Sequence, residues 1–273
     1  MNDIALEISS LQVHANQSER ILVDNLSFTL KKGESLALVG ESGCGKTMTA
    51  SAVMGLLPAG VHKTSGRIII LGEDTAVWSA EQYRSARNKR VSIVMQNPMS
   101  AFDPVLTVLS HFSETFVSHG YDRRKIRDIA LEALARVGFP NPYVILDMYP
   151  FQMSGGMLQR VMLAIALLSR PSIMIADEAT TDLDLVAQKK ILSLLEAYRR
   201  ENDCALLIIT HDFGVAASLA QNMILMKDGK IVERGEAKTF FTSPKSEYAQ
   251  GLLDAHRALY TERFNKLMEL IEA

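Results

Sequence analysis

Short apolar runs separated by turn residues follow one another along most of the chain, a pattern typical of alternating strands and helices. Aliphatic and β-branched residues predict three strands before residue 40, at Leu6–Val13, Leu22–Leu30 and Ser35–Val39. Later runs of the same kind predict four more strands, at Arg67–Leu71, Val91–Met95, Ile173–Ala176 and Ala205–Ile209.

Helical segments are predicted between these runs. Thr47–Leu57 follows a strand and is halted by Pro58. The predicted helix Val186–Arg199 lies between two apolar strands, and this β-α-β order implies parallel pairing in a sheet that is buried on both faces. Two further strands, Met223–Met226 and Lys230–Arg234, flank an Asp-Gly pair and predict a hairpin.

One long segment changes character. Asn97–Pro150 is mostly helical in pattern, and Arg123–Val137 is its clearest amphipathic stretch. We therefore predict one domain over residues 1–273, with a helical subdomain inserted at about residues 97–170. A C-terminal helical extension is expected at about residues 240–273, where Tyr248–Ala273 is helical in pattern.

Composition narrows the class of protein. Hydrophobic residues make up 48% of the chain and charged residues 22%, as in an ordinary globular protein, and a net charge of −2 gives no reason to expect a nucleic-acid partner. Cys44 and Cys204 cannot form a disulfide framework, which favours a reducing compartment. The longest apolar run, Val161–Leu168, is too short to cross a bilayer, and the first residues lack the features of a secretion signal. Any membrane crossing is therefore expected from another polypeptide.

The segment Gly40–Thr47 matches the phosphate-loop pattern of two glycines, a lysine and a hydroxyl between a strand and a helix. Backbone N–H groups and the positive end of the helix dipole can surround a phosphate there. We expect Lys46 to neutralise the β- and γ-phosphates and the Thr47 hydroxyl to bind Mg²⁺. The predicted nucleotide contacts are Gly40, Glu41, Ser42, Gly43, Cys44, Gly45, Lys46, Thr47 and Met48.

Two acidic residues follow a buried strand. Asp177 and Glu178 come directly after Ile173–Ala176, and open parallel sheets bind their ligands at the carboxyl ends of strands. Asp177 is expected to hold Mg²⁺ and Glu178 to deprotonate the attacking water. The alternative is an acidic pair that only caps the next helix.

Gln96 and His211 each end another apolar run. Gln96 offers a carbonyl oxygen for Mg²⁺ and an amide for the water, whereas His211 is expected to contact the γ-phosphate and align the water with Glu178. Taken alone, Gln96 would more often be an ordinary polar strand end, and His211 could be a structural histidine whose hydrogen bonds are satisfied.

Ser154-Gly155-Gly156 forms a second cluster of donors before a predicted helix, Met157–Leu168. It could be a simple helix cap. However, Lys46 and Thr47 already serve one nucleotide, so this second cluster is better suited to a nucleotide held by a neighbouring subunit.

The ordered series of motifs, over about Ile4–Arg234, resembles the ATP-binding subunits of ABC transporters. This resemblance implies a RecA-like P-loop α/β core with an antiparallel β-subdomain and the inserted helical subdomain. It also implies ATP and Mg²⁺ as cofactors and pairs of subunits that enclose two ATP molecules. By this resemblance Asp184 belongs to the family's D-loop, Thr181–Asp184, and is expected near the nucleotide.

Within that family the chain is most similar to the peptide/nickel importer group, and in it to nickel-importer ATPase subunits of the D type. The segments that carry this likeness are Met95–Pro98, Ser100–Pro104, Tyr149–Arg160 and Thr180–Asp184. The likeness implies two membrane permeases, a second ATPase that is related or identical, an extracytoplasmic solute-binding protein reached indirectly, and a place on the cytoplasmic face of the bacterial inner membrane.

The chain departs from the family's usual pattern at three points. As in the nickel-type subunits, Met157 follows Ser154-Gly155-Gly156 where a glutamine is usual, and Ala179 follows Glu178 where a proline is usual in the family. The aromatic residue that stacks on adenine is missing, and His14 is the expected substitute.

Three functions remain open at this stage. The first is an importer ATPase whose cargo is nickel, another metal, a metal chelate or a peptide. The second is an ABC-type ATPase that acts on nucleic acid or ribosomes without a membrane partner. The third is a small-molecule kinase, in which Ser154-Gly155-Gly156 would have no purpose.

Overall fold

The centre of the protein is a six-stranded, mostly parallel sheet. The computed structural model describes residues 3–15, 20–87, 89–117, 120–181 and 183–259. The strand order is β10-β9-β3-β8-β7-β6, and only β10 runs antiparallel to its neighbour. The strands are β3 (Ser35–Val39), β6 (Val91–Val94), β7 (Ile173–Asp177), β8 (Ala205–Thr210), β9 (Asn222–Lys227) and β10 (Lys230–Glu236).

Both faces of this sheet are covered, which explains the continuous apolar runs of its inner strands. Every residue of β3, β7 and β8 is buried. Along β3, Leu36 and Leu38 pack into one hydrophobic cluster, whereas Ala37 and Val39 pack into the other. The sheet therefore separates two hydrophobic cores, one on each face.

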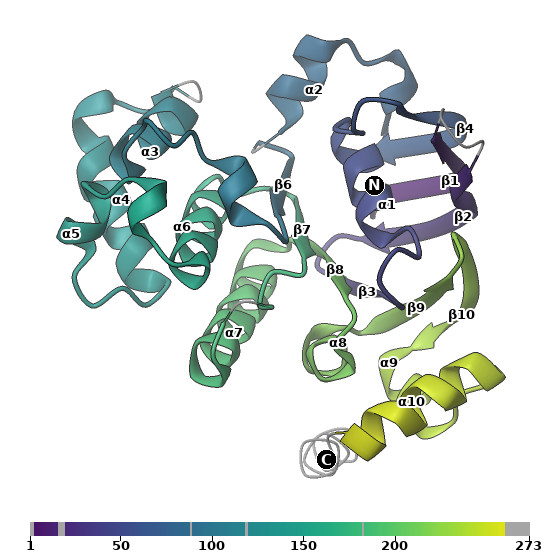
Figure 1. Ribbon diagram of the computed structural model, residues 1–273. Helices are drawn as coiled ribbons and strands as arrows, with labels where there is room; N and C mark the ends of the chain where they lie inside the picture. Colours follow the sequence, from purple (N-terminus) through teal and green to yellow (C-terminus); the bar gives the residue numbers. More distant parts are fainter. Residues whose placement is uncertain (1–2, 16–19, 88, 118–119, 182, 260–273) are drawn as a thin grey trace.

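A second sheet of four antiparallel strands lies beside the first, in the order β2-β1-β4-β5 (Figure 1). Its strands are β1 (Ile4–Ala15), β2 (Arg20–Lys31), β4 (Val61–Ile70) and the short β5 (Glu73–Asp74). Buried residues alternate with more exposed ones along most of β1 and β2, as expected for strands with one covered face, and irregular pairing interrupts the alternation.

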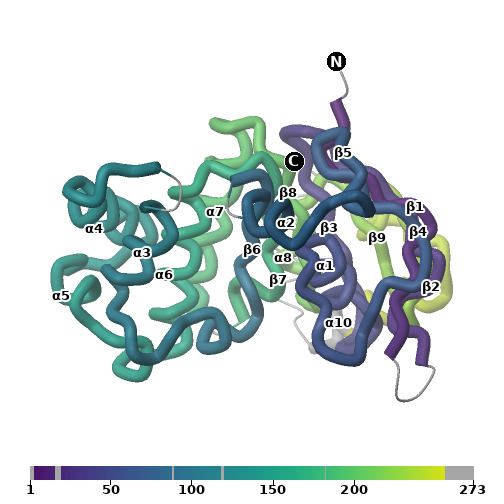
Figure 2. Tube along the Cα trace, turned by 90° about the horizontal axis from the view of Figure 1, so that it is seen from above, coloured from purple at the N-terminus to yellow at the C-terminus, as the bar shows by residue number. Residues whose placement is uncertain are grey.

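Helices between β6 and β7 form a separate group on the other side of the parallel sheet (Figures 1 and 2). They are the 3₁₀ helices η2 (Pro98–Ala101), η3 (Arg123–Lys125) and η4 (Pro150–Gln152), and α3 (Val108–Val117), α4 (Ile126–Arg136), α5 (Pro142–Leu146) and α6 (Gly155–Leu168). Their apolar side chains, such as Phe112 and Leu134, join the same core as one face of the parallel sheet.

The remaining helices connect or flank the two sheets. They are α1 (Lys46–Met54), η1 (Thr75–Val77), α2 (Ala80–Ala86), α7 (Leu185–Asn202), α8 (Phe213–Leu219), α9 (Ala237–Thr242) and α10 (Glu247–Leu259). None of the helices in the described part of the chain is both long and apolar enough to span a lipid bilayer.

The predicted fold class is confirmed, although several boundaries differ. The helix expected at Thr47–Leu57 ends at Met54, because Gly55 adopts a left-handed conformation and its N–H bonds back to the last turn. β4 starts at Val61, six residues before the expected Arg67, because the whole segment pairs with β1. Residues 260–273 of the expected terminal helix lie outside the described residues.

Candidate nucleotide-binding and hydrolysis site

The phosphate loop lies between β3 and α1, and the backbone of neighbouring strands packs closely against two of its glycines. A Cβ atom at Gly40 would collide with the carbonyl oxygen of Met226. A Cβ at Gly45, where φ is +105°, would lie 2.5 Å from the carbonyl oxygen of Leu22. Glycine is therefore required at both positions, because β9 and β2 leave no room for a side chain.

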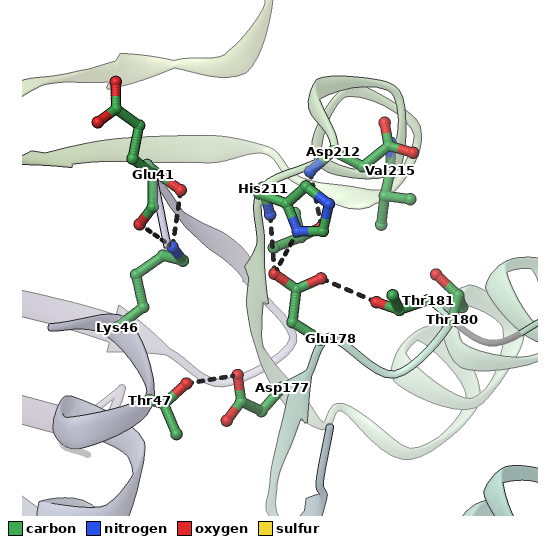
Figure 3. A network of polar contacts seen from close by, with 12 residues as sticks. Glu41, Lys46, Thr47, Asp177, Glu178, Thr180, Thr181, His211, Asp212 and Val215 are labelled. Atoms are coloured by element: carbon green, nitrogen blue, oxygen red, sulfur yellow. Dashed lines mark hydrogen bonds and ion pairs between the residues drawn. The ribbon is translucent and has the colours of Figure 1, made fainter. Parts of the chain in front are cut away.

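Lys46, the first residue of α1, is directed into the loop. Its side chain is buried, and its Nζ donates hydrogen bonds to the carbonyl oxygens of Gly40 at 2.7 Å and Glu41 at 2.9 Å (Figure 3). These bonds hold a positive charge among the loop's backbone groups, where a phosphate would be bound. Cys44 is also buried, with its Sγ 3.6 Å from Lys46 Nζ.

Thr47 joins the phosphate loop to the end of β7. Its hydroxyl donates a hydrogen bond to Asp177 Oδ1 at 3.3 Å. Asp177 is almost fully buried, and this burial raises the pKa of its carboxyl to about 6, with the neighbouring Glu178 adding to the rise. A hydroxyl and a carboxylate side by side are the oxygen ligands that Mg²⁺ prefers, so the two residues fit a magnesium site.

Glu178 is held by three hydrogen bonds. Its Oε1 accepts from the backbone N–H of His211 at 3.0 Å and lies 2.7 Å from His211 Nδ1, and its Oε2 accepts from Thr181 Oγ1 at 3.0 Å (Figure 3). The backbone of Glu178 is left-handed, with φ of +51°, and its N–H donates to Ile209 of β8. The carboxylate therefore has one fixed position, as general-base catalysis requires.

A cleft of about 640 Å³ connects these groups. Of the predicted residues, it is lined by Gly40, Glu41, Ser42, Gly43, Gly45, Lys46, Thr47, Met48, Gln96, Glu178 and His211. Gln96 reaches the cleft from the end of β6, where it is exposed. The structure thus gathers residues from β3, α1, β6, β7 and β8 around one space.

Sequence reasoning missed five residues of this region. Thr181 binds Glu178, although it was named only as part of a family motif. Arg20, Leu22, Phe213 and Leu252 line the cleft. Neither a strand start nor a helix face distinguishes such residues in the sequence, because their role depends on which elements become neighbours.

Two predicted contacts lie elsewhere. His14 is half-buried near the end of β1, opposite Ile21 and His62, and is not among the residues that line the cleft. Asp184 caps α7 by accepting hydrogen bonds from the N–H groups of Val186 and Ala187. Both remain predictions as nucleotide contacts.

Ser154, Gly155 and Gly156 also lie away from the cleft lining. Ser154 caps α6, with its hydroxyl accepting from the N–H of Met157 at 3.3 Å, and Ser154 and Gly155 are exposed. From the same helix, Gln159 donates a hydrogen bond to the carbonyl oxygen of Met95, next to Gln96. Ser154, Gly155 and Gly156 therefore do not line the cleft at the phosphate loop. The helix that they begin, α6, is nevertheless bonded to the chain next to Gln96, which does line it.

Comparison with known proteins decides the family. Residues 23–181 match the family described as "ABC transporter". The chain belongs to this ABC transporter family. The nickel import ATP-binding protein NikD of Rhodospirillum rubrum is 42% identical over 93% of this chain and 94% of its own length. The dipeptide transport ATP-binding protein DppD of Bacillus subtilis is 42% identical over 85% of this chain and 70% of its own length.

Solved structures give the same family. The dimeric structure of the bacterial ABC transporter cassette MJ0796 matches with a TM-score of 0.77 and 25% identity, over 85% of this chain and 98% of that one. A dimer of the same cassette in a post-hydrolysis state, bound to ADP and phosphate, matches equally well. As an ABC transporter ATPase, this chain binds and hydrolyses ATP, which confirms the predicted activity and excludes the small-molecule kinase.

Proposed function

We propose that this chain is the ATP-hydrolysing subunit of an importer whose cargo is nickel or a related transition metal, free or chelated. The observation that supports nickel as the cargo is the similarity to the nickel import ATP-binding protein, which extends over nearly the full length of both chains. Uptake of a di- or oligopeptide is the second candidate, favoured by the similarity to the dipeptide transport protein.

The arrangement of side chains supports a hydrolytic site. Lys46 and the backbone N–H groups of the loop bind the phosphates, and Glu178 takes the proton of the attacking water, which Gln96 and His211 orient. Thr47 and Asp177 would hold Mg²⁺, which supplies positive charge to the β- and γ-phosphates when bound. His211 donates to Glu178 through its backbone N–H and so also fixes the base.

Hydrolysis is proposed to need a second ATPase subunit. Ser154-Gly155-Gly156 presents exposed donors at a helix start but does not line this chain's own cleft. A second subunit, either identical or related, would place its own copy of this segment against the cleft. The dimeric cassettes among the similar structures are consistent with that arrangement.

The helical group offers a surface for membrane partners. Four of its large apolar side chains are more than half exposed: Val105, Tyr143, Val144 and Phe151. Exposed apolar side chains of this size are typical of interaction surfaces. We propose that two membrane permeases dock here and hold the chain at the cytoplasmic face of the inner membrane, with a solute-binding protein delivering the cargo on the other side.

Co-purification and transport together test this function. The tagged chain, extracted from membranes in mild detergent, should retain two permease chains and a second ATPase. In vesicles that contain this complex and are supplied with the solute-binding protein, ATP should drive uptake of ⁶³Ni²⁺, whereas a labelled dipeptide should not be taken up. Uptake of the dipeptide alone would select the second candidate. A chain that retains no permease and whose ATP hydrolysis is stimulated by RNA or DNA would overturn the proposal.

A further inference from the structure

Four residues that line the cleft have no role in phosphate binding or in the hydrolytic reaction. They are Arg20, Leu22, Phe213 and Leu252. ATP carries a base and a ribose in addition to its phosphates, so part of this lining must contact them. The position of the reacting groups indicates which part.

The reacting end of the cleft is marked by Gln96, Glu178 and His211, which come from the ends of β6, β7 and β8. β2 lies on the opposite side of α1 from β6 and β7 in both views of the molecule (Figures 1 and 2). A nucleotide with its γ-phosphate at Glu178 and its other phosphates along the start of α1 therefore extends its base toward β2.

β2 also touches the phosphate loop directly. The carbonyl oxygen of Leu22 lies against Gly45, so close that a side chain there would not fit. Arg20 and Leu22 both line the cleft, and the pairing of β2 with β1 is irregular at Leu22, because Val13 lies opposite Val23 whereas His14 lies opposite Ile21. Between and beyond them, Ile21 is partly exposed and Val23 is fully buried in the core. The two cleft residues of β2 thus form a short wall next to the loop.

Phe213 is a poor alternative for the base. It follows His211 by two residues and so belongs to the reacting end of the cleft. Its ring is only 5% exposed and stacks on Phe240 at 6.3 Å, with Phe241 against it at 6.1 Å. The ring is therefore already part of the aromatic core under α8 and α9.

We propose that the guanidinium group of Arg20 stacks on the adenine ring and that Leu22 gives the apolar contact beside it. Arg20 is exposed, and the structure gives its side chain neither a hydrogen bond nor an ion pair within the described residues. A planar cation is attracted to the face of a π system, which the adenine ring offers. Stacking reads no pattern of donors and acceptors, so this contact predicts weak selection between purine nucleotides.

Binding of two polyphosphates tests this role. Equilibrium affinities are measured for ATP and for inorganic tripolyphosphate, which has no base, on the full chain. For Arg20→Ala we expect the ATP affinity to fall roughly tenfold, with the tripolyphosphate affinity unchanged. Leu22→Ala should show a smaller loss of the same kind, and GTP should compete with ATP within about threefold for the unaltered chain.

Substitutions at the same position separate stacking from charge. Arg20→Trp keeps a flat surface without the charge and should restore most of the ATP affinity, whereas Arg20→Lys keeps the charge without the flat surface and should restore little. An equal loss for ATP and tripolyphosphate, or full recovery with Arg20→Lys, would show that Arg20 acts on phosphate charge and would overturn the proposal. No loss with Arg20→Ala would do the same.

The proposal depends on ATP binding and not on the proposed cargo. A variant of the phosphate loop distinguishes a failure of the phosphate site from a failure of the role given to Arg20. Lys46→Ala should weaken both ligands, since it removes a phosphate contact. If it does so while Arg20→Ala changes neither affinity, the phosphate site stands and only the role of Arg20 is wrong.

Discussion

The phosphate loop Gly40–Thr47 and the segment Ser154–Gly156 both place glycines at the start of a helix, yet their surroundings differ. Strands β2 and β9 press on the loop, and Gln96, Glu178 and His211 join it around one cleft. Ser154 only caps its own helix and is exposed. A helix start is thus a potential anion site in both places, but only at the first does this chain gather further polar side chains around one cleft. This difference is the reason for proposing that the second segment acts on another molecule.

The largest expected effect separates ATP binding from ATP hydrolysis at the cleft of the phosphate loop. Glu178→Gln keeps the shape of the side chain but removes the base, so the rate of ATP hydrolysis should fall roughly a thousandfold while ATP still binds. Turnover of radiolabelled ATP and equilibrium binding measure the two effects. Unchanged turnover would remove Glu178 from its role.

The second region should act in the opposite way, on the site of a partner. Ser154→Ala is expected to lower hydrolysis roughly a hundredfold, because a donor to the phosphates is lost, without weakening ATP binding to the altered chain alone. Ser154→Thr keeps the hydroxyl and is the matched control.

Mixing variants shows on which subunit Ser154 acts. If two copies of this chain associate, a mixture of Glu178→Gln and Ser154→Ala chains forms some dimers with one intact site, and activity should return. With a related partner, Ser154→Ala should instead silence the partner's site. At high dilution the chains are separate monomers. A Ser154→Ala chain that hydrolyses ATP at the full rate under these conditions would contradict the division into two half-sites.

Burial of Asp177, which we propose to hold Mg²⁺, should have a cost in folding stability. Asp177 has a pKa of about 6 in the fold against an ordinary value of 3.8. Below about pH 3.8 its carboxyl is neutral in both states, and above about pH 6 the folded protein must hold a buried carboxylate. Folding stability is therefore lost as the pH rises between these values, by up to about 3 kcal/mol. Asp177→Asn should lack this loss.

Urea unfolding in EDTA at several pH values measures this difference. The free energy of unfolding of Asp177→Asn should exceed that of the unaltered chain at pH 7 and approach it at pH 4. Two curves that stay parallel over this range would show that burial of Asp177 carries no such cost. No comparable loss is expected for Ser154→Ala, because Ser154 is exposed.

The smallest effect should come from the residue that supports the base. Thr181→Val removes the hydrogen bond to Glu178 Oε2 and should lower kcat about threefold to tenfold, with KM for ATP nearly unchanged. Thr181→Ser keeps the hydroxyl and should retain the rate. An equal loss in both variants would indicate a role in packing instead of in orienting Glu178.

The strands of the parallel sheet were predictable because both of its faces are covered, so that Ile173–Ala176 and Ala205–Ile209 are apolar at every position. Helices such as α2 (Ala80–Ala86) and α9 (Ala237–Thr242) were missed, since each is short and its pattern too brief to distinguish from a loop. β4 was predicted too short because its first residues, including Lys63 and Ser65, are polar and are ordered by pairing with β1.

The sequence alone determined which groups lie together, because Gly40–Thr47, Gln96, Asp177–Glu178 and His211 each follow an apolar strand and parallel strands end at one edge. Tertiary structure decided which further side chains meet them. Thr181 reaches Glu178, and Arg20 and Leu22 reach the loop, only through the crossing of separate elements. Local sequence patterns record how a segment buries its own surface, whereas contacts between distant segments arise when the sheets and helices pack together.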